Sequence, residues 1–362
     1  MPHAGSFVAS RVRALRAANV QVDLIGLDLI SRVAGQDEIT NEVQWKGLEA
    51  SWGRATRLVA KMRPDAFRAR SVSRDVLKMT TGGYDAVVAH GMFTPPAGLV
   101  GRHVANELGV PLIVQLHGSD VNVAMARFPK LHSSVLNGAD GVIFVSQPLL
   151  ARARELGFSS ARSAVVPNGV DSGLFRFEGA RSTVKHVAFV GNLEYVKGAD
   201  RLPRIFRGLR NFDPGVRLTV IGSGSLKKRI SEEFRASGLS DVNLMGTLPH
   251  AEVAEVLRTT DVLVMPSRSE GWPCVVLEAH ASGCLVIATD VGGTAEALGS
   301  RQYVVSSDRP VEDAIVSKTI SALRAEGAGA VQRRTRAEAF DWTATVGREL
   351  EHINAWTRDG GP

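Results

Sequence analysis

Glu270 and Glu278 bracket a predicted corner between a loop and a helix in the stretch Ser269 to Ala279. The apolar segment before it, Asp261 to Met265, predicts a buried strand, and Val275 to Ala281 predicts a helix. The corner therefore follows the carboxyl end of a strand, where parallel α/β sheets bind ligands and where free helix N–H groups favour phosphate. The alternative is structural: Glu270 would cap the helix, and Glu278 would be a solvated helix residue.

Lys197 lies in a second candidate segment, the glycine-flanked run Gly191 to Gly198, which follows an apolar strand pattern. A lysine in such a loop can approach phosphate oxygens and neutralise part of a diphosphate. It can equally be an ordinary surface lysine. A carboxylate such as that of Glu278 can accept hydrogen bonds from both hydroxyls of a nucleotide ribose. Together, these residue types favour a nucleotide carrying a diphosphate as the ligand.

The chain has 362 residues, of which 44% are hydrophobic and 22% are charged. This length predicts two domains, and the composition is typical of soluble globular proteins. No apolar run approaches the roughly 18 residues that span a membrane, and no signal pattern opens the sequence, so the cytoplasm is the expected compartment. The two cysteines, Cys274 and Cys284, lack metal-ligand spacing and are interpreted as small apolar residues.

The net charge of +6 raises the question of an anionic partner. Nucleic acid is not expected, because the basic residues are dispersed among acidic ones and no basic platform with interleaved aromatic residues is present. The segment Trp52 to Lys78 holds eight basic and two acidic residues. It fits a solvated helical face and, as an alternative, a peripheral contact with anionic lipid at the inner membrane face.

Helix and strand patterns alternate through the first half of the chain. Apolar residues from Phe7 to Leu15 recur at helical spacing, and those from Val20 to Leu24 alternate as in a strand. Four further strands are predicted at Asp85 to Ala89, Leu112 to Leu116, Gly141 to Val145 and Ala164 to Val166. Each ends in a small polar cluster, so the carboxyl edge of this first sheet is the predicted functional edge.

The segment Pro2 to Ser6 has the character of the glycine-containing turn that follows the first strand of a doubly wound domain. The strand that should precede this turn is absent from the sequence. Either the given start is late, which is the preferred explanation, or the domain lacks one strand.

The second half predicts another Rossmann-like sheet after a polar linker at Asp171 to Lys185. Its strands are expected at His186 to Val190, Val216 to Ile221, Val242 to Met245, Val262 to Met265 and Leu285 to Ala288. Helices are expected from about Ala199, from Leu226, over Glu312 to Glu326 and over Trp342 to Trp356. The predicted domains are residues 1–170 and 171–341, with the helix at about 342–357 packing back on the first domain.

Gly222, Ser223 and Gly224 form only an incomplete dinucleotide signature. No third glycine completes it, and no acidic residue follows at the usual distance for a ribose contact. An enzyme that transfers hydride is therefore not favoured.

Seven residues separate Glu270 from Glu278, and this spacing resembles the E-x7-E signature of retaining glycosyltransferases of the GT-B fold, in the large family-four group. The supporting motifs are His117 to Asp120, Pro167 to Asp171, Gly191 to Gly198, and Gly292-Gly293 with Glu296. The resemblance implies an α/β fold of two Rossmann-like domains facing a cleft, with an N-terminal acceptor domain and a C-terminal domain for the nucleotide-sugar donor.

The resemblance also assigns roles to residues of the C-terminal domain. Lys197 is expected to bind the donor diphosphate, Glu278 the ribose, and Leu248 the nucleobase. Val275 and Val276 are expected to bring helix N–H groups to the phosphates.

The same resemblance places the reacting sugar beside Glu270, whose carboxylate is expected to hold sugar hydroxyls. The neighbouring backbone is expected to help, at Gly271, Trp272, Pro273 and Cys274. In the N-terminal domain, His117 is expected beside the sugar and Asp120 on the acceptor side, while Gly5 lets the first loop approach both substrates. Glu270, His117 and Lys197 are the expected catalytic residues.

The resemblance further implies retaining transfer of a hexose from a nucleotide sugar to a saccharide, lipid-linked or small-molecule acceptor, in polysaccharide or glycoconjugate biosynthesis. No cofactor and no metal are expected, since a helix N-terminus and basic side chains can stabilise the leaving diphosphate. One departure is Asn192, which stands where the family commonly has Arg. Losing such a charge-assisted contact weakens binding by about 1.5 to 3 kcal/mol.

Two other functions fit parts of the pattern. A sugar-nucleotide epimerase of similar architecture would leave the Glu270 and Glu278 stretch less well explained. A non-catalytic protein that binds sugar nucleotides is suggested only by Asn192 and by the short N-terminus.

Overall fold

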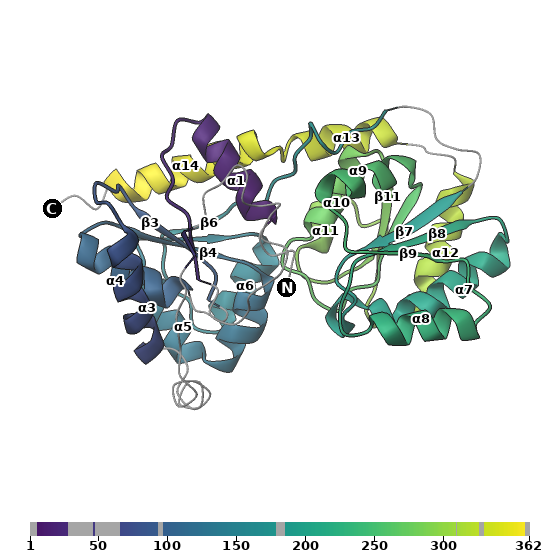
Figure 1. The fold of residues 1–362 in the computed structure, drawn as a ribbon, viewed down its shortest axis with the longest axis horizontal. Helices are drawn as coiled ribbons and strands as arrows, with labels where there is room; N and C mark the ends of the chain where they lie inside the picture. Colours follow the sequence, from purple (N-terminus) through teal and green to yellow (C-terminus); the bar gives the residue numbers. More distant parts are fainter. Residues whose placement is uncertain are drawn as a thin grey trace. The chain divides into compact units, whose positions relative to one another are not determined.

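The computed structural model of the chain describes residues 6–27, 46–47, 66–92, 97–178, 185–308, 310–325 and 329–358. It forms two compact units: unit 1 comprises Met1–Asn168 with Trp342–Pro362, and unit 2 comprises Gly169–Asp341 (Figure 1). Gly5 and residues 52–65 of the basic segment lie outside the described residues. No helix in the described ranges is long and apolar enough to cross a membrane.

Unit 1 is built on a four-stranded parallel sheet in the order β3-β4-β5-β6. The strands are β3 Val87–His90, β4 Leu112–Leu116, β5 Gly141–Phe144 and β6 Ser163–Val165. They confirm the four strands expected from the apolar runs, with small differences at the ends. Every residue of β4 is buried, which explains why this run is apolar without interruption.

Helices cover both faces of the unit 1 sheet (Figure 1). One face carries α1 Ser6–Ala17 and α14 Trp342–Arg358, and the opposite side carries α3 Ala66–Met79, α4 Ala97–Leu108 and α5 Pro129–Asn137. The remaining elements, α6 Gln147–Glu155 and the π-helix η2 Asp120–Met125, contact each other.

The helix α14 at the end of the chain belongs to unit 1. Trp356 packs with Ile113 and Ile143 of the sheet, and a Cβ added at Gly141 would overlap with the Trp356 ring. Glu349 of α14 forms a buried ion pair with Arg11 of α1.

The strand predicted at Val20 to Leu24 is wrong. Exposure does alternate along these residues, but no ladder of hydrogen bonds forms there among the described residues. Instead β1 Ile25–Gly26 pairs in parallel with β2 Lys46–Gly47. An alternating pattern shows which side chains turn inward, but a strand also needs a partner strand.

Unit 2 is built on a six-stranded parallel sheet in the order β12-β11-β10-β7-β8-β9. The strands are β7 His186–Val190, β8 Arg217–Ile221, β9 Asn243–Gly246, β10 Val262–Met265, β11 Leu285–Thr289 and β12 Val304–Val305. The first five confirm the predicted strands. The chain runs outward from β7 through β8 to β9 and then returns to β10 on the other side of β7, so the strand order reverses between β7 and β10.

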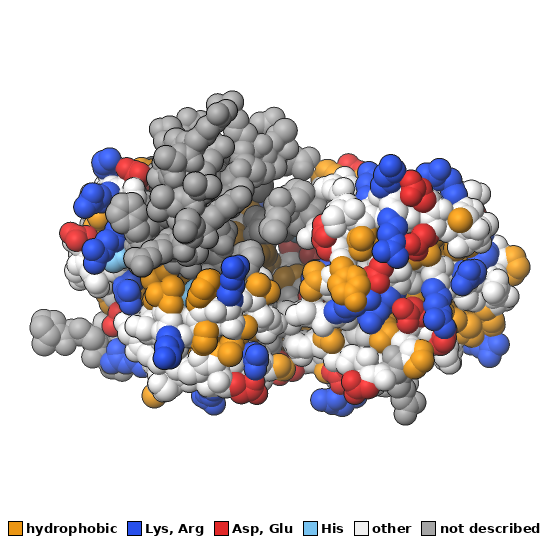
Figure 2. All heavy atoms as spheres, turned by 90° about the horizontal axis from the view of Figure 1, so that it is seen from below, with side chains coloured by type: hydrophobic (Ala, Val, Ile, Leu, Met, Phe, Trp, Pro, Cys, Tyr) orange, Lys and Arg blue, Asp and Glu red, His pale blue; other side chains and the backbone are white. Residues whose placement is uncertain are grey.

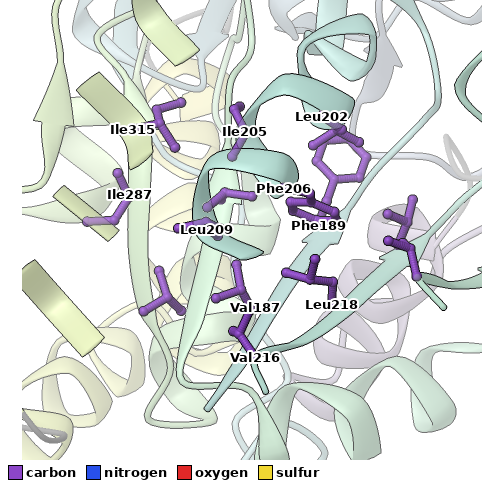
Figure 3. Close-up of a cluster of buried hydrophobic side chains, with 14 of the residues drawn as sticks. Val187, Phe189, Leu202, Ile205, Phe206, Leu209, Val216, Leu218, Ile287 and Ile315 are labelled. Atoms are coloured by element: carbon purple, nitrogen blue, oxygen red, sulfur yellow. The ribbon is translucent and has the colours of Figure 1, made fainter. Parts of the chain in front are cut away.

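Helices cover both faces of this sheet as well, with α9 His250–Thr259, α10 Cys274–Ala281 and α11 Thr294–Leu298 on one face (Figure 1). The other face carries α7 Leu202–Phe212, α8 Lys227–Ala236 and α12 Val311–Arg324, while α13 Ala330–Glu338 packs against α10. The core between α7 and the sheet contains Phe189, Ile205 and Phe206 (Figure 3). The single-turn 3-10 helix η4 Ala199–Arg201 precedes α7, whose first turn contains Pro203, a position that proline favours.

The expected linker is partly folded. Phe175 is 2% exposed and packs edge-on against His250 with ring centroids 5.9 Å apart. Residues 171–178 are therefore part of unit 2, whereas residues 179–184 lie outside the described ranges. Figure 2 shows one face of the protein, where the described acidic and basic side chains are interspersed rather than gathered by sign.

Candidate active site

The strand reversal in unit 2 places two loops side by side. The first follows β7 and contains the single-turn 3-10 helix η3 Tyr195–Lys197. The second follows β10 and leads into α10. Because β7 and β10 are paired neighbours, both loops leave the same edge of the sheet at the point where the strand order reverses. In open α/β sheets this point is the usual ligand-binding crevice.

Lys197 and Glu270 join these two loops. The Lys197 Nζ donates to both Glu270 carboxylate oxygens, at 2.8 and 2.7 Å. The Ser267 hydroxyl donates to Glu270 Oε1 at 2.7 Å. Glu270 is 7% exposed, so the carboxylate is held in one orientation by three hydrogen bonds from two donor groups in a nearly dry environment.

Arg268 also contacts the loop that carries Lys197. Its guanidinium donates to both carboxylate oxygens of Asp200 at 2.7 and 2.8 Å and to the Tyr195 carbonyl at 2.7 Å. It also lies 3.6 Å from the centroid of the Tyr195 ring. The Arg268 backbone N–H donates to the Val196 carbonyl at 2.8 Å. This bidentate and stacked arrangement fixes the backbone that presents Lys197.

Two glycines allow the loops to approach this closely. Gly198 has a φ of 67°, and a Cβ there would overlap with the Pro266 carbonyl. Gly292 has a φ of 53°, and a Cβ there would overlap with the Glu270 carbonyl. The neighbouring Gly293 N–H donates to the Gly271 carbonyl at 3.1 Å. Gly292 and Gly293, which follow β11, thus pack directly against the backbone of the loop that carries Glu270.

Glu278 lies on α10 and is half-buried. Its carboxylate makes no side-chain hydrogen bond or ion pair with any residue in the described ranges. Desolvation by burial raises its pKa to about 7. A carboxyl group that is partly removed from water without a partner is suited to accept hydrogen bonds from a ligand.

The other residues of unit 2 that are expected to contact the nucleotide sugar differ in which of their groups are accessible. Trp272 is buried against Phe340 with ring centroids 5.5 Å apart, so only its backbone is available. The Val276 N–H donates to the Pro273 carbonyl at 3.0 Å, and its expected contact with the phosphates stays a prediction. Five predicted side chains at this edge are half-buried or buried: Asn192, Leu248, Pro273, Cys274 and Val275.

His117 lies at the carboxyl end of β4 in unit 1, beside His90 at the end of β3. The two rings are stacked with centroids 5.8 Å apart, and His90 Nδ1 lies 3.5 Å from His117 Nε2. Phe7 of α1 packs against His117 at 4.8 Å between centroids. Burial lowers the pKa of both histidines, and the charge of Arg11 adds to this effect. Both imidazoles are therefore neutral near pH 7.

Asp120 is buried at the start of η2, shortly after β4. It is 3% exposed, and its carboxylate accepts the N–H of Met92 at 2.8 Å and that of His117 at 2.7 Å. The carboxylate therefore organises the loops after β3 and β4, and its expected role on the acceptor side stays a prediction.

Sequence reasoning missed Ser267, Arg268 and Asp200, although all three fix the central ion pair. The only signal was position, because Ser267 and Arg268 directly follow a buried strand. His90, the last residue of β3, was not expected as a site residue. Within the described part of the chain, no group of three or more His, Cys, Asp or Glu side chains is arranged to hold a metal ion.

Family models match both units. A model described as glycosyl transferases group 1 matches residues 173–339, and a glycosyl transferase 4-like domain matches residues 4–169. A D-inositol 3-phosphate glycosyltransferase of Geodermatophilus obscurus is 31% identical over 315 residues, 78% of this chain and 68% of that protein. The putative teichuronic acid biosynthesis glycosyltransferase TuaC of Bacillus subtilis is 30% identical over 233 residues, 60% of this chain and 56% of that protein. The chain spans between 56% and 65% of the length of TuaC and two other curated relatives.

Solved structures show the same fold. Sucrose-phosphate synthase from Thermosynechococcus elongatus superposes with a TM-score of 0.76 at 20% identity, covering 98% of this chain and 93% of that one. Anabaena HepE in complex with UDP and glucose superposes with a TM-score of 0.68 at 17% identity, covering 88% of each chain.

Proposed function

The chain belongs to the group 1 glycosyltransferases, with the two-domain GT-B fold, and on this premise we propose that it transfers a sugar from a nucleotide-sugar donor to an acceptor hydroxyl. The observation that carries the proposal is the Lys197 to Glu270 pair at the strand reversal of unit 2. It places a cation and an oriented carboxylate where an open α/β sheet binds nucleotides.

The donor would be held mainly by unit 2. Lys197 would neutralise the diphosphate, and Glu278 would accept hydrogen bonds from the ribose hydroxyls. Glu270, with the backbone of residues 271–274, would hold the hydroxyls of the transferred sugar. The UDP and glucose bound to the structurally similar Anabaena HepE support a sugar nucleotide as the ligand class.

Transfer would proceed with retention and without a metal. The acceptor oxygen bonds to the anomeric carbon on the face that the diphosphate leaves, through an oxocarbenium-like state. The bond between the anomeric carbon and the phosphate oxygen breaks, and the acceptor proton passes to the departing phosphate. Lys197 and the N-terminal end of α10 would stabilise the negative charge on the leaving group.

His117 would act in unit 1, on the side of the acceptor. Its neutral ring can both donate and accept a hydrogen bond, which suits contacts with sugar hydroxyls. The acceptor class would be a saccharide, a lipid-linked sugar or a small molecule, as in glycoconjugate biosynthesis. In the described part of the basic segment, α3 exposes Arg70, Arg74 and Lys78 at a spacing of four residues, which is compatible with a peripheral contact with anionic lipid.

A thermal-shift screen with UDP-, GDP- and ADP-sugars tests donor binding, because a ligand that binds only the folded state raises its stability. The proton NMR spectrum of the product then reports its anomeric configuration. Retention supports the mechanism, whereas inversion contradicts it. Conversion of the donor sugar without any acceptor would favour an epimerase.

A further inference from the structure

Most cations that the described residues bring to the carboxyl edge of the unit 2 sheet already have partners. Lys197 is paired with Glu270, and Arg268 is paired with Asp200. Arg201 donates to the Pro266 carbonyl at 2.8 Å and lies 3.7 Å from Glu312, so its guanidinium group already has partners after β10 and on α12. A nucleoside diphosphate brings several negative charges to this edge, and these three residues offer little net positive charge to meet them.

Lys227 is different. It is the first residue of α8, is exposed, and forms no ion pair or side-chain hydrogen bond with a residue in the described ranges. Its Nζ lies 3.9 Å from the position that a Cβ would take on Gly246, at the end of β9. The ammonium group therefore sits at the same edge of the sheet as the ion pair, on the opposite side of β7 from β10.

Glycines stand at the carboxyl ends of β7, β8 and β9, at the sheet edge where Lys227 lies. Gly191 follows β7, Gly222 follows β8, and Gly246 ends β9. The Gly222 N–H donates to the Gly246 carbonyl at 2.7 Å, and a Cβ on Gly222 would overlap with the Gly191 carbonyl. This glycine row packs the three strand ends closely together at the carboxyl edge, where doubly wound sheets bring their backbone near phosphate groups.

Hydrogen bonds join the start of α8 to the loop that carries Lys197. The Leu193 N–H donates to the Ser223 carbonyl at 2.9 Å, and the Leu226 N–H donates to the Leu193 carbonyl at 3.0 Å. The Glu194 carboxylate accepts the Ser225 N–H at 2.7 Å and the Ser225 hydroxyl at 2.5 Å. These bonds from Ser225 also lower the pKa of Glu194. Lys197 and Lys227 are thus presented by one connected piece of backbone.

We propose that Lys227 is a second cation for the phosphate groups of the donor, a role that rests on the proposed function. Its ammonium group contacts phosphate oxygens from the side of the glycine row, while Lys197 contacts them from the side of Glu270. Asn192 lies on the same loop and has an uncharged, half-buried side chain, so it adds no positive charge. The long side chain of Lys227 supplies that charge from the neighbouring helix.

The test compares Lys227→Met with Lys228→Met, the adjacent exposed lysine of α8. Calorimetric titrations use UDP, GDP and ADP, and the matching nucleosides uridine, guanosine and adenosine. Lys227→Met should weaken binding of the preferred nucleoside diphosphate by about ten- to a hundredfold, because a charge-assisted contact is lost. Binding of the nucleoside should not change, and Lys228→Met should bind both ligands as the wild type does. Circular dichroism verifies that both variants are folded.

Three results would overturn the inference. Equal affinity of Lys227→Met and wild type for the diphosphate would show that Lys227 makes no phosphate contact. An equal loss for the nucleoside would place Lys227 at the base or ribose instead. If the wild type bound none of the nucleotides, the proposed function itself would fail, and the inference with it.

Discussion

Lys197 and Glu270 lie 73 positions apart in the chain, yet the lysine Nζ donates to both carboxylate oxygens of the glutamate at 2.8 and 2.7 Å. The ammonium group of Lys197 and the carboxylate of Glu270 therefore neutralise each other in the structure. A bound diphosphate would compete with Glu270 for the Lys197 ammonium group. A sugar hydroxyl could then take the place that the lysine leaves on the carboxylate. Under the proposed function, the pair would thus link phosphate binding to sugar binding.

The first prediction concerns the stability of this pair. Lys197→Met leaves the Glu270 carboxylate buried without its cation, which should lower the free energy of unfolding by about 1 to 3 kcal/mol. The lysine side chain is 33% exposed, so solvent screening keeps the loss below that of a fully buried pair. Adding Glu270→Gln should recover part of this loss. Urea unfolding of the single and double variants measures the coupling.

The exposed pair of Arg204 and Asp313 provides the control, since its side chains are 56% and 63% exposed. Arg204→Met should change stability by less than about 1 kcal/mol. An additive double variant at Lys197 and Glu270 would contradict the prediction of a coupled pair.

The second prediction concerns the pH dependence of stability through Glu278. Its pKa of about 7 in the folded protein exceeds the ordinary value of 4.5, so the folded state binds the proton more tightly than the unfolded state. The resulting stabilisation is present below about pH 4.5 and is lost as the pH rises to about 7. As the pH rises from about 4.5 to about 7, the free energy of unfolding of Glu278→Gln should therefore increase relative to that of the wild type, by at most about 3 kcal/mol. A constant difference between pH 4.5 and 7.5 would contradict the assignment.

The third prediction uses the same carboxyl group in donor binding. Ribose hydroxyls donate to the ionised form, so nucleoside affinity should fall as the pH drops below about 7. A nucleoside is the suitable probe because it carries no phosphate that titrates in this range. Calorimetry on the wild type and on Glu278→Gln checks this. The variant should bind weakly and without this pH dependence, and a wild-type affinity that is flat across the interval would exclude a ribose contact.

The fourth prediction concerns the glycine support of the Glu270 loop. Gly292→Ala combines a positive φ with an overlap against the Glu270 carbonyl, so the loop must move and activity should fall at least about tenfold. Gly238→Ala is the matched control, because Gly238 has a φ of 71° and no atom within 4 Å of an added Cβ. It should lose only about 1 kcal/mol of stability and keep its activity. Equal activities of the two variants would argue against this support.

The fifth prediction concerns Arg268 as a positioning residue for Lys197. Arg268→Lys keeps the charge but cannot reproduce the two bonds to Asp200 and the stacking on Tyr195. We expect weaker binding of the nucleoside diphosphate, with nucleoside binding unchanged. Arg235→Lys, at an exposed position on α8, serves as the control. If the diphosphate bound equally well to Arg268→Lys and to wild type, the contacts of Arg268 with Asp200 and Tyr195 would have no role in donor binding.

The sequence predicted the sheets well because buried parallel strands are short apolar runs bounded by glycine or polar residues. The run Leu112 to Leu116 coincides with β4, and His186 to Val190 coincides with β7. The strand expected at Val20 to Leu24 failed because alternation alone does not supply a partner strand.

The candidate site was only partly predictable. Glu270 and Lys197 stood out by their local motifs, but their partners Ser267, Arg268 and Asp200 depend on two loops meeting at the strand reversal. Asp120 had the right residue type for a ligand contact, yet its carboxylate is used by the N–H groups of Met92 and His117. A single sequence does not reveal whether a carboxylate is already occupied by the backbone.

The central claim is sugar transfer that depends on the Lys197 to Glu270 pair. In the most direct test, wild type and Glu270→Ala are each incubated with the donor selected by thermal shift and with a panel of saccharide acceptors. Mass spectrometry then follows the acceptor and the released nucleoside diphosphate. We expect equal amounts of glycosylated acceptor and nucleoside diphosphate from the wild type, and a rate at least about a hundredfold lower from the folded variant. Equal turnover by wild type and Glu270→Ala would contradict the central claim.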